Sequence, residues 1–299
     1  MCPFAFCLLP FAFCLLPFVR QEQRITMFAW IKRKLKQNLR AFQPINASHW
    51  REATAAYLFM RGMSAADSEH LRLLSSHFLQ SKRISGAAEL EITPLMRTQI
   101  AAQACILVLQ LGLDYYKGWS DIILYPGQFV PEREEVDEAG VVHTTRNVLA
   151  GEAWLGGPVI LSYDDVARAS DAQHRVDGAN VVIHEFAHKL DMLNGAPNGF
   201  PPLHKGMSLE TWRRDFMGAY LDFCKRVDAA EARSRQDHGA ALDALTIDPY
   251  AAENPAEFFA VISETFFEVP NAVHSEYPAV YAQLKAFYKQ DPLLRLARS

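Results

Sequence analysis

Cysteine is scarce in this chain, and its distribution excludes a disulfide-stapled fold. Five cysteines occur in 299 residues, and Cys2, Cys7 and Cys14 of these lie in an apolar leader. The other two, Cys105 and Cys224, are far apart in apolar segments with helical character. The cysteines lack the regular spacing of a secreted, disulfide-bonded protein, so we expect a reducing, cytoplasmic compartment.

An excess of basic charge is also missing. The formal net charge is −4, which argues against nucleic acid as a main partner. The basic run from Lys32 to Arg40 is explained more simply as a solvated helix face than as a nucleic-acid or membrane contact. With 50% hydrophobic residues, the chain is long enough for one generous core, or for one core with a helical extension.

The leader contains a perfect tandem repeat. The heptapeptide PFAFCLL runs from Pro3 to Leu9 and recurs unchanged from Pro10 to Leu16. A signal peptide or membrane anchor fits its apolar character, but no basic residue precedes it, prolines interrupt it and no small-residue cleavage site follows. A translated upstream segment fits better, because MFAWIKRKLKQNLR from Met27 onward is an ordinary amphipathic, basic beginning. A membrane-anchored protein remains the alternative if the leader is part of the native chain.

We therefore expect two regions of different character. Residues 1–26 should lie outside the fold, and residues 27–299 should form a single domain. Within that domain we expect a helical part over 27–112 and a catalytic part over 113–299. Periodicity, caps and turn residues predict four helices and two strands: helices from Ser64 to Gln80, from Thr93 to about Gly112, from Ser208 to Ala230 and from Tyr277 to Tyr288, and strands at Asp121–Tyr125 and Pro158–Ser162. A short strand within Ser85–Ile92 and an exposed hairpin or loop around EREEVDEAG are also expected.

One stretch carries recognisable chemistry, VVIHEFAHKLD from Val181 to Asp191. On a helix, His184 and His188 share one face and can converge on one metal ion, while Glu185 points toward the open coordination position. This is the layout for a metal-activated water and its general base. Apolar neighbours indicate a buried helix, where unpaired imidazoles would be costly. Two core histidines bonded to backbone groups are the simpler alternative.

A catalytic zinc ion needs a third protein ligand. The best candidate lies in YAAENPAEFFAVISETFFE, from Tyr250 to Glu268. Glu257 opens a helix there, with Asn254 as its cap and Pro255 in its first turn. Because apolar residues surround it, such a carboxylate is metal-bound, paired or turned out to water. His204 and His238 are weaker candidates, since both sit in polar, loop-like segments.

The ends of the metal helix and a neighbouring strand can also be anticipated. Asp177 is a plausible cap for the metal helix, and Asn194-Gly195 a good terminating pair. A strand within Gly151–Ser162 should run beside this helix and can hold a peptide by strand addition. Trp154 would then lie near the cleft, although plain core packing explains it equally well.

Three segments together resemble a known family. HEFAHKLD at His184–Asp191, YAAENPAEFFAVISETFFEVP at Tyr250–Pro270 and GEAWLGGPVILSYDDV at Gly151–Val166 are similar to the Mlc titration factor A family of zinc peptidases. The catalytic domain of that family resembles that of anthrax lethal factor. The resemblance extends from about Met27 to about Leu296 and does not cover the leader.

The resemblance implies a fold, a cofactor and an activity. The implied fold is α+β: a mostly helical, zincin-like (gluzincin) metallopeptidase domain with a small mixed sheet beside the HExxH helix. The implied metal is one Zn²⁺ per chain, with His184, His188 and Glu257 as ligands. Glu185 matches the general base, and Tyr250 matches a tyrosine that can donate a hydrogen bond to the oxyanion. Aminopeptidase-like action on small peptides and interaction with Mlc, a transcriptional repressor of sugar transport, are also implied.

Two acidic residues have less certain roles. Asp191 lies three positions after His188 and can orient a metal ligand. Glu264 lies seven positions after Glu257, on the same helical face, and can hydrogen-bond either histidine. An ordinary helix salt bridge explains either residue equally well.

A protein of another class remains as the alternative. A peptidase fold can serve as a regulatory binding protein that sequesters a transcriptional repressor, with a zinc ion that is structural or vestigial. A closed site with four ligands would favour this alternative, and His143 or His204 could supply the fourth side chain.

Overall fold

The protein is described here by a computed structural model. It describes residues 42–128, 132–136, 142–146, 151–153, 156–169, 179–237, 242 and 244–297. The chain divides into two compact units, Met1–Gln43 and Pro44–Ser299, and all that follows concerns the second. The boundary expected at Met27 lies outside the described residues. Within the described ranges, no helix is long and apolar enough to cross a membrane.

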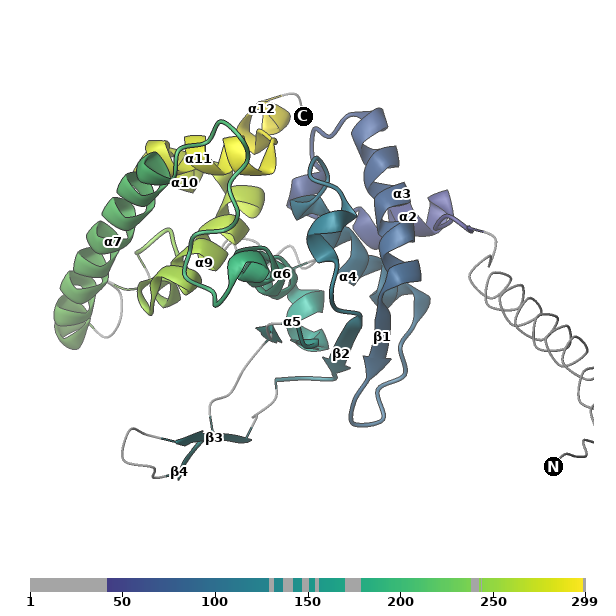
Figure 1. The fold of residues 1–299 in the computed structure, drawn as a ribbon, viewed down its shortest axis with the longest axis horizontal. Helices are drawn as coiled ribbons and strands as arrows, with labels where there is room; N and C mark the ends of the chain where they lie inside the picture. Colours follow the sequence, from purple (N-terminus) through teal and green to yellow (C-terminus); the bar gives the residue numbers. More distant parts are fainter. Residues whose placement is uncertain are drawn as a thin grey trace, which may run out of the picture. The chain divides into compact units, whose positions relative to one another are not determined.

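The second unit is mostly helical and includes a small sheet (Figure 1). Its strands are β1 (Arg83–Gly86), β2 (Asp121–Tyr125), β3 (Glu132–Val136), β4 (Val142–Arg146), β5 (Gly151–Ala153) and β6 (Val159–Ser162). Its α-helices are α2 (Ala47–Thr54), α3 (Ala65–Ser81), α4 (Pro94–Leu107), α5 (Tyr163–Arg168), α6 (Val181–Asp191), α7 (Leu209–Asp237), α9 (Pro255–Glu268), α10 (Pro270–Glu276), α11 (Pro278–Tyr288) and α12 (Pro292–Leu296). Short 3₁₀ helices are η1 (Leu58–Met60), η2 (Leu113–Tyr116), η3 (Met192–Asn194) and η4 (Pro249–Ala252).

The sheet is mixed, with strand order β1-β2-β6-β5. Strands β1, β2 and β6 are parallel, and β5 pairs antiparallel with β6 at the edge, with Glu152 opposite Ile160. Alternate residues of β2, Ile122 and Leu124, are completely buried because successive side chains in a strand point to opposite faces. The strands predicted at DIILY and PVILS are confirmed, and so is the hairpin, formed by β3 and β4. The short strand expected within Ser85–Ile92 begins two residues earlier, at Arg83.

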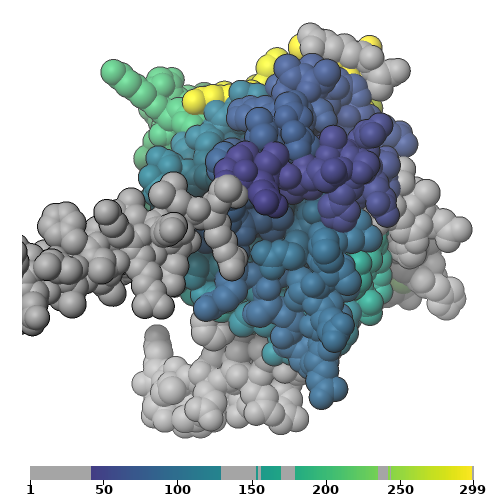
Figure 2. All heavy atoms as spheres, turned by 90° about the vertical axis from the view of Figure 1, so that its right-hand side faces the viewer, coloured from purple at the N-terminus to yellow at the C-terminus, as the bar shows by residue number. Residues whose placement is uncertain are grey.

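The first helices follow their capping signals. Ser64 accepts a hydrogen bond from the Asp67 N–H at the start of α3, and Thr93 does the same for Met96 at the start of α4, with Pro94 in its first position. Helix α4 is buried almost all round, as its apolar sequence predicts. It ends at Leu107, five residues before the expected Gly112, because the chain then tightens into turns and Gly112 adopts a positive φ of 86°. Figure 2 faces this side of the unit, where the purple residues of α2 lie against the blue residues that follow them.

Helix α6 lies at the centre of the unit, packed against α4, α9 and the sheet (Figure 1). Its Phe186 ring is completely buried among the rings of Phe78, Tyr116 and Trp119, at centroid distances of 5.7, 5.1 and 5.6 Å. This aromatic packing holds one side of α6 against the N-terminal helices. The opposite side faces α9.

Helix α9 is anchored by its phenylalanines. Phe259 is completely buried and lies 6.2 Å from the ring of Trp212 on α7 and 6.2 Å from that of Phe287 on α11. Helix α11 confirms the helix predicted from Tyr277 to Tyr288, and its Leu284 and Phe287 are completely buried. Helix α7 runs seven residues past the expected end at Ala230, since EARSRQD contains no glycine or proline to stop it. The predicted α+β class with a small mixed sheet beside the HExxH helix agrees with this architecture.

Candidate metal centre

Helix α6 brings the two histidines together. The Nε2 atoms of His184 and His188 lie 3.1 Å apart, and the ring centroids are 4.8 Å apart. Residues four apart share one face of a helix, so the local sequence alone produces this pair. Helix η3 follows α6, and Gly195 then has a φ of 140°, which agrees with the terminating pair predicted at Asn194-Gly195.

Helix α9 supplies the carboxylate that completes the cluster. Asn254 caps this helix by accepting the N–H groups of Ala256 and Glu257. Glu257 Oε2 lies 3.0 Å from His184 Nε2 and 3.2 Å from His188 Nε2. Glu257 is thus held in the first turn of α9 and directed at the two imidazoles of α6.

The triangle of these ligand atoms has the dimensions of a metal site. Its edges are 3.0, 3.1 and 3.2 Å. A tetrahedral zinc ion with bonds of about 2.0 to 2.1 Å requires ligand atoms about 3.3 Å apart. Among the described residues, His184, His188 and Glu257 are the group of side chains that can hold a metal ion in this way. The chemistry of the set, two imidazoles and one carboxylate, suits zinc.

The hydrogen bond on the far side of His184 determines which ring nitrogen faces the triangle. Nδ1 lies 2.6 Å from Glu264 Oε1, and a carboxylate can only accept, so Nδ1 carries the proton and donates it. In the neutral ring, Nε2 therefore presents a lone pair to Glu257. The three ligand atoms lie 3.0 to 3.2 Å apart, so either a proton on a ring nitrogen or a metal ion has to lie between them.

The electrostatics of the metal-free protein lead to the same requirement. Burial by itself lowers the pKa of His184, but Glu264 and the other nearby carboxylates outweigh it and raise that pKa well above the ordinary value of 6.5. Burial works in the other direction on Glu257, yet the hydrogen bonds from His184 and His188 hold its pKa far below the usual range. The site therefore favours a positive charge at its centre, which either a proton or a metal ion can provide.

Glu185 lies beside the cluster with one oxygen atom unpaired. The side chain is 5% exposed, and its Oε2 has no hydrogen-bond partner among the described residues. Burial raises the pKa of Glu185 to about 7, against the opposing effect of the two imidazoles. A buried, unpaired carboxylate oxygen indicates a place for a water molecule or a substrate group. Its pKa near neutrality suits a group that gains and loses a proton.

Tyr250 stands at the exposed side of the cluster. It lies in η4, it is 49% exposed, and its ring centroid is 6.1 Å from that of His184. Asp248 accepts the backbone N–H of Tyr250 at 2.8 Å, and the hydroxyl of Tyr220 on α7 donates to the Ala252 carbonyl at 3.3 Å. Both contacts fix the segment that carries the tyrosine.

The two acidic residues with uncertain roles have different surroundings. Glu264 is buried and accepts from His184 Nδ1, as described above. Asp191 Oδ2 instead accepts the backbone N–H groups of Asn198 and Gly199 at 2.6 and 2.7 Å, so it shapes the loop that follows α6. Asp191 Oδ1 and His188 Nδ1 are buried and have no hydrogen-bond partner among the described residues.

Of the other candidate histidines, the one whose side chain the structure describes, His204, does not join the cluster. Both ring nitrogens of His204 have partners elsewhere, Nδ1 with the Tyr115 hydroxyl at 3.3 Å and Nε2 with the Phe287 carbonyl at 2.6 Å. His204 is therefore not a fourth ligand. His238, Trp154 and the side chain of His143 lie outside what the structure describes.

Two residues beside the cluster escaped the sequence analysis. The cap of α6 is Asn180, so the prediction of Asp177 is wrong: the helix begins at Val181, and Asn180 Oδ1 accepts the N–H of Ile183 at 3.0 Å. Asn180 Nδ2 also donates to Glu268 Oε1 at 2.8 Å. The signal for the cap was present, since asparagine is a favoured capping residue directly before an apolar run. No local signal pointed to Glu268 as its partner.

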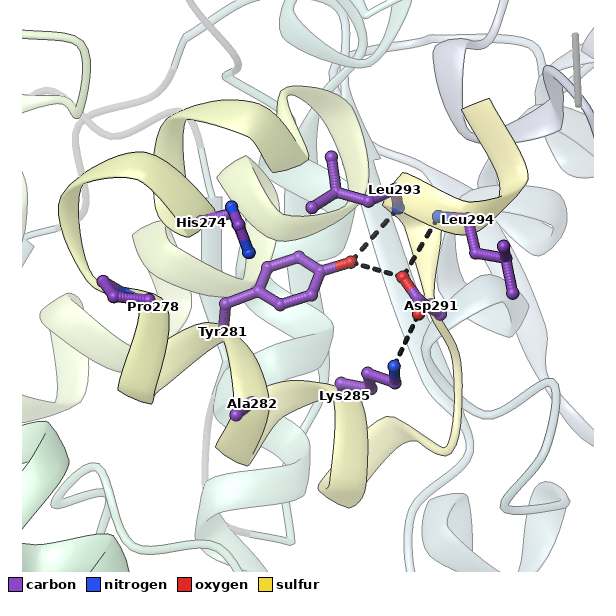
Figure 3. Close-up of a pocket in the computed structure, with 8 residues that line it drawn as sticks. All are labelled: His274, Pro278, Tyr281, Ala282, Lys285, Asp291, Leu293 and Leu294. Carbon is purple, nitrogen blue, oxygen red and sulfur yellow. Dashed lines mark hydrogen bonds and ion pairs between the residues drawn. The ribbon is translucent and has the colours of Figure 1, made fainter. Parts of the chain in front are cut away.

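A separate hollow of about 480 Å³ lies among helices α10, α11 and α12 (Figure 3). Lys285 pairs with Asp291 at 2.6 Å, and the Tyr281 hydroxyl donates to the same carboxylate at 2.7 Å. None of the three metal-ligand candidates lines this hollow. Its charged lysine and aspartate satisfy each other, whereas the metal cluster has the unpartnered, buried Glu185 Oε2 beside it.

Comparisons with known proteins agree with this geometry. A family described as the glucose-regulated metallopeptidases M90 matches residues 29–289. Mlc titration factor A of Yersinia enterocolitica serotype O:8 / biotype 1B is 35% identical over 252 residues, which cover 84% of this chain and 88% of that relative. Mlc titration factor A of Klebsiella pneumoniae strain 342 is 36% identical over 247 residues, which cover 83% and 88%. The chain therefore belongs to the glucose-regulated metallopeptidase family M90, together with these Mlc titration factors A.

Proposed function

We propose that this protein is a zincin-like, zinc-dependent peptidase. The observation that carries the proposal is the triangle of ligand atoms at His184, His188 and Glu257, with edges of 3.0 to 3.2 Å. These residues would hold one zinc ion per chain. When bound, the ion would lower the pKa of a water molecule and polarise the scissile carbonyl group.

Glu185 acts as the general base and then as the general acid. It takes a proton from the attacking water and delivers that proton to the leaving amine, so that one carboxylate serves both steps. Its pKa of about 7 in the metal-free protein, raised by burial, supports this role. Its unpaired, buried Oε2 is the atom that would receive the proton.

Tyr250 stabilises the developing oxyanion by donating a hydrogen bond from its hydroxyl group. Its position beside His184 and its 49% exposure support this role, because the ring is close to the ligands and open to substrate. Glu264 is a positioning residue in this scheme, since it keeps the Nε2 lone pair of His184 directed at the metal position. Asp191 stabilises the loop after α6 through its hydrogen bonds from Asn198 and Gly199.

The substrate class we propose is small peptides, cleaved in an aminopeptidase-like manner. The edge strand β5 lies beside α6 and pairs on one side only with β6 among the described strands. An extended peptide can add to such an edge through backbone hydrogen bonds. Free cysteines, with Cys105 completely buried, agree with the proposed cytoplasmic location.

The name of these relatives supports a second role. Both are called Mlc titration factor A, which connects them with Mlc. We propose that this chain also binds an Mlc-like transcriptional repressor. A purely regulatory protein with a closed structural zinc site is disfavoured, because His204 is engaged elsewhere and the described residues offer three ligands.

Metal analysis with a panel of peptide substrates tests the proposal. Wild-type protein should bind one zinc ion and cleave at least one peptide. Glu185→Gln should retain zinc and lose about 10²-fold to 10⁴-fold in turnover, because the proton acceptor is gone. Tyr250→Phe should retain zinc and lower kcat more than it raises KM. Full activity in Glu185→Gln, or a wild-type protein that binds no zinc, would refute the peptidase assignment.

A further inference from the structure

Asn180, the residue before α6, uses every polar group that it has. Its side chain is 1% exposed. Its N–H donates to Glu264 Oε2 at 2.5 Å, and its carbonyl accepts the N–H of His184 at 2.9 Å. Its Oδ1 accepts the N–H of Ile183 at 3.0 Å, and its Nδ2 donates to Glu268 Oε1 at 2.8 Å. An ordinary helix cap makes the bonds to Ile183 and His184, so the contacts with Glu264 and Glu268 go beyond capping.

Two of these contacts converge on the metal ligand His184. The Asn180 carbonyl holds the backbone N–H of His184, and the Asn180 N–H holds the carboxylate that accepts from the His184 ring. Asn180 therefore constrains both the backbone of His184 and the carboxylate of Glu264, which accepts from the His184 ring. A rotation of Asn180 would move Glu264 relative to the ring.

The amide plane of Asn180 is fixed from two sides. Its φ of −147° and ψ of 93° are extended, as is usual for a residue that caps a helix. The Ile183 N–H holds Oδ1 from α6, and Glu268 holds Nδ2 from α9. On α9, Glu264 lies two helical turns after Glu257, and Glu268 lies one turn after Glu264. The three carboxylates therefore share the face of α9 that points toward α6.

We propose that Asn180, held by Glu268, is a positioning residue for the metal site, which gives asparagine a role beyond capping. The asparagine amide offers separate atoms for the two contacts, an oxygen that accepts from the helix and a nitrogen that donates to Glu268. Aspartate would place two carboxylates against each other, and serine would cap the helix without reaching Glu268 as a donor. This inference rests on the metal site proposed above.

The experiment measures the zinc dissociation constant by competition with a chromophoric chelator, using the full chain. Asn180→Ser keeps an oxygen for the cap but removes the amide NH₂ group that donates to Glu268, and Glu268→Leu removes the acceptor from the other helix. Each should weaken zinc binding about 10-fold, the effect usual for partners that orient a metal ligand. Glu268→Gln keeps an acceptor oxygen and should bind zinc like the wild type. Ser64→Ala, which removes the cap of the distant helix α3, is the matched control and should leave zinc affinity unchanged.

The outcomes separate this inference from the peptidase assignment. Suppose that the wild-type protein binds zinc, and that Asn180→Ser and Glu268→Leu have the same zinc dissociation constant as the wild type. The inference about Asn180 is then wrong, while the proposed metal site stands. If Ser64→Ala weakens binding as much as the other two, or Glu268→Gln as much as Glu268→Leu, the hydrogen bond is not the cause and the inference is also wrong. If wild-type protein binds no zinc, the metal site itself is refuted. Should Glu268→Leu fail to fold, Asn180→Ser gives the decision alone, because it retains the cap.

Discussion

Glu264→Gln is the substitution whose effect on the metal site follows most directly from the structure. Each oxygen of Glu264 accepts one N–H, from His184 Nδ1 at 2.6 Å and from the Asn180 backbone at 2.5 Å. A glutamine of the same shape can accept only one of them. If its NH₂ group faces His184, the ring must move its proton to Nε2, and the lone pair directed at the metal is lost. If the NH₂ group faces Asn180, a buried N–H loses its acceptor at a cost of about 1 to 3 kcal/mol.

Both arrangements weaken the site, so the zinc dissociation constant should rise about 10-fold to 100-fold, equivalent to about 1.4 to 2.8 kcal/mol. Chelator competition at fixed pH measures this change. The matched control is Glu276→Gln, which removes a carboxylate paired with Arg226 at 2.6 Å and touches neither histidine. Zinc binding in Glu264→Gln as tight as in the wild type would refute the assignment of the His184 tautomer.

Two further predictions concern pH and stability. Burial raises the pKa of Glu185 from 4.5 to about 7, and nearby carboxylates raise that of His184 above 6.5, so the metal-free fold holds protons that the unfolded chain has released. Its stability should therefore fall as pH rises, through Glu185 between about 4.5 and 7 and through His184 above 6.5. Zinc displaces the His184 proton, so its affinity should rise over the same window, and a dissociation constant that stays flat from pH 6.5 to 8 would contradict this. Phe259→Ala should lower the free energy of unfolding in urea by about 3 to 5 kcal/mol, since the ring is completely buried against α7 and α11. Leu209→Ala, at a site 61% exposed, should change it by less than about 0.5 kcal/mol, and equal losses in the two variants would show that Phe259 does not anchor α9.

Much of the secondary structure could be predicted because its signals are local. Ser64, Thr93 and Asn254 each precede an apolar run and each caps the helix that follows. The predicted helix boundaries are wrong where two capping residues lie close together or where no residue marks the end of a helix. The sequence pattern predicts Asp177 as the cap of α6, where Asn180 caps the helix, and it ends α7 too early because no glycine or proline marks the end.

The sequence by itself determined the pair of imidazoles, because residues four apart on a helix face the same way regardless of the rest of the fold. It also made Glu257 a candidate ligand, since a carboxylate in a phenylalanine-rich helix needs a partner. Only the tertiary structure brought Glu257 to 3.0 Å from His184 and joined Asn180 to Glu268, a separation of 88 residues along the chain. Those distances depend on how α9 packs between α6, α7 and α11. The packing of helices that are far apart in the chain follows from the shapes of all their side chains together. No short-range sequence pattern encodes those combined shapes.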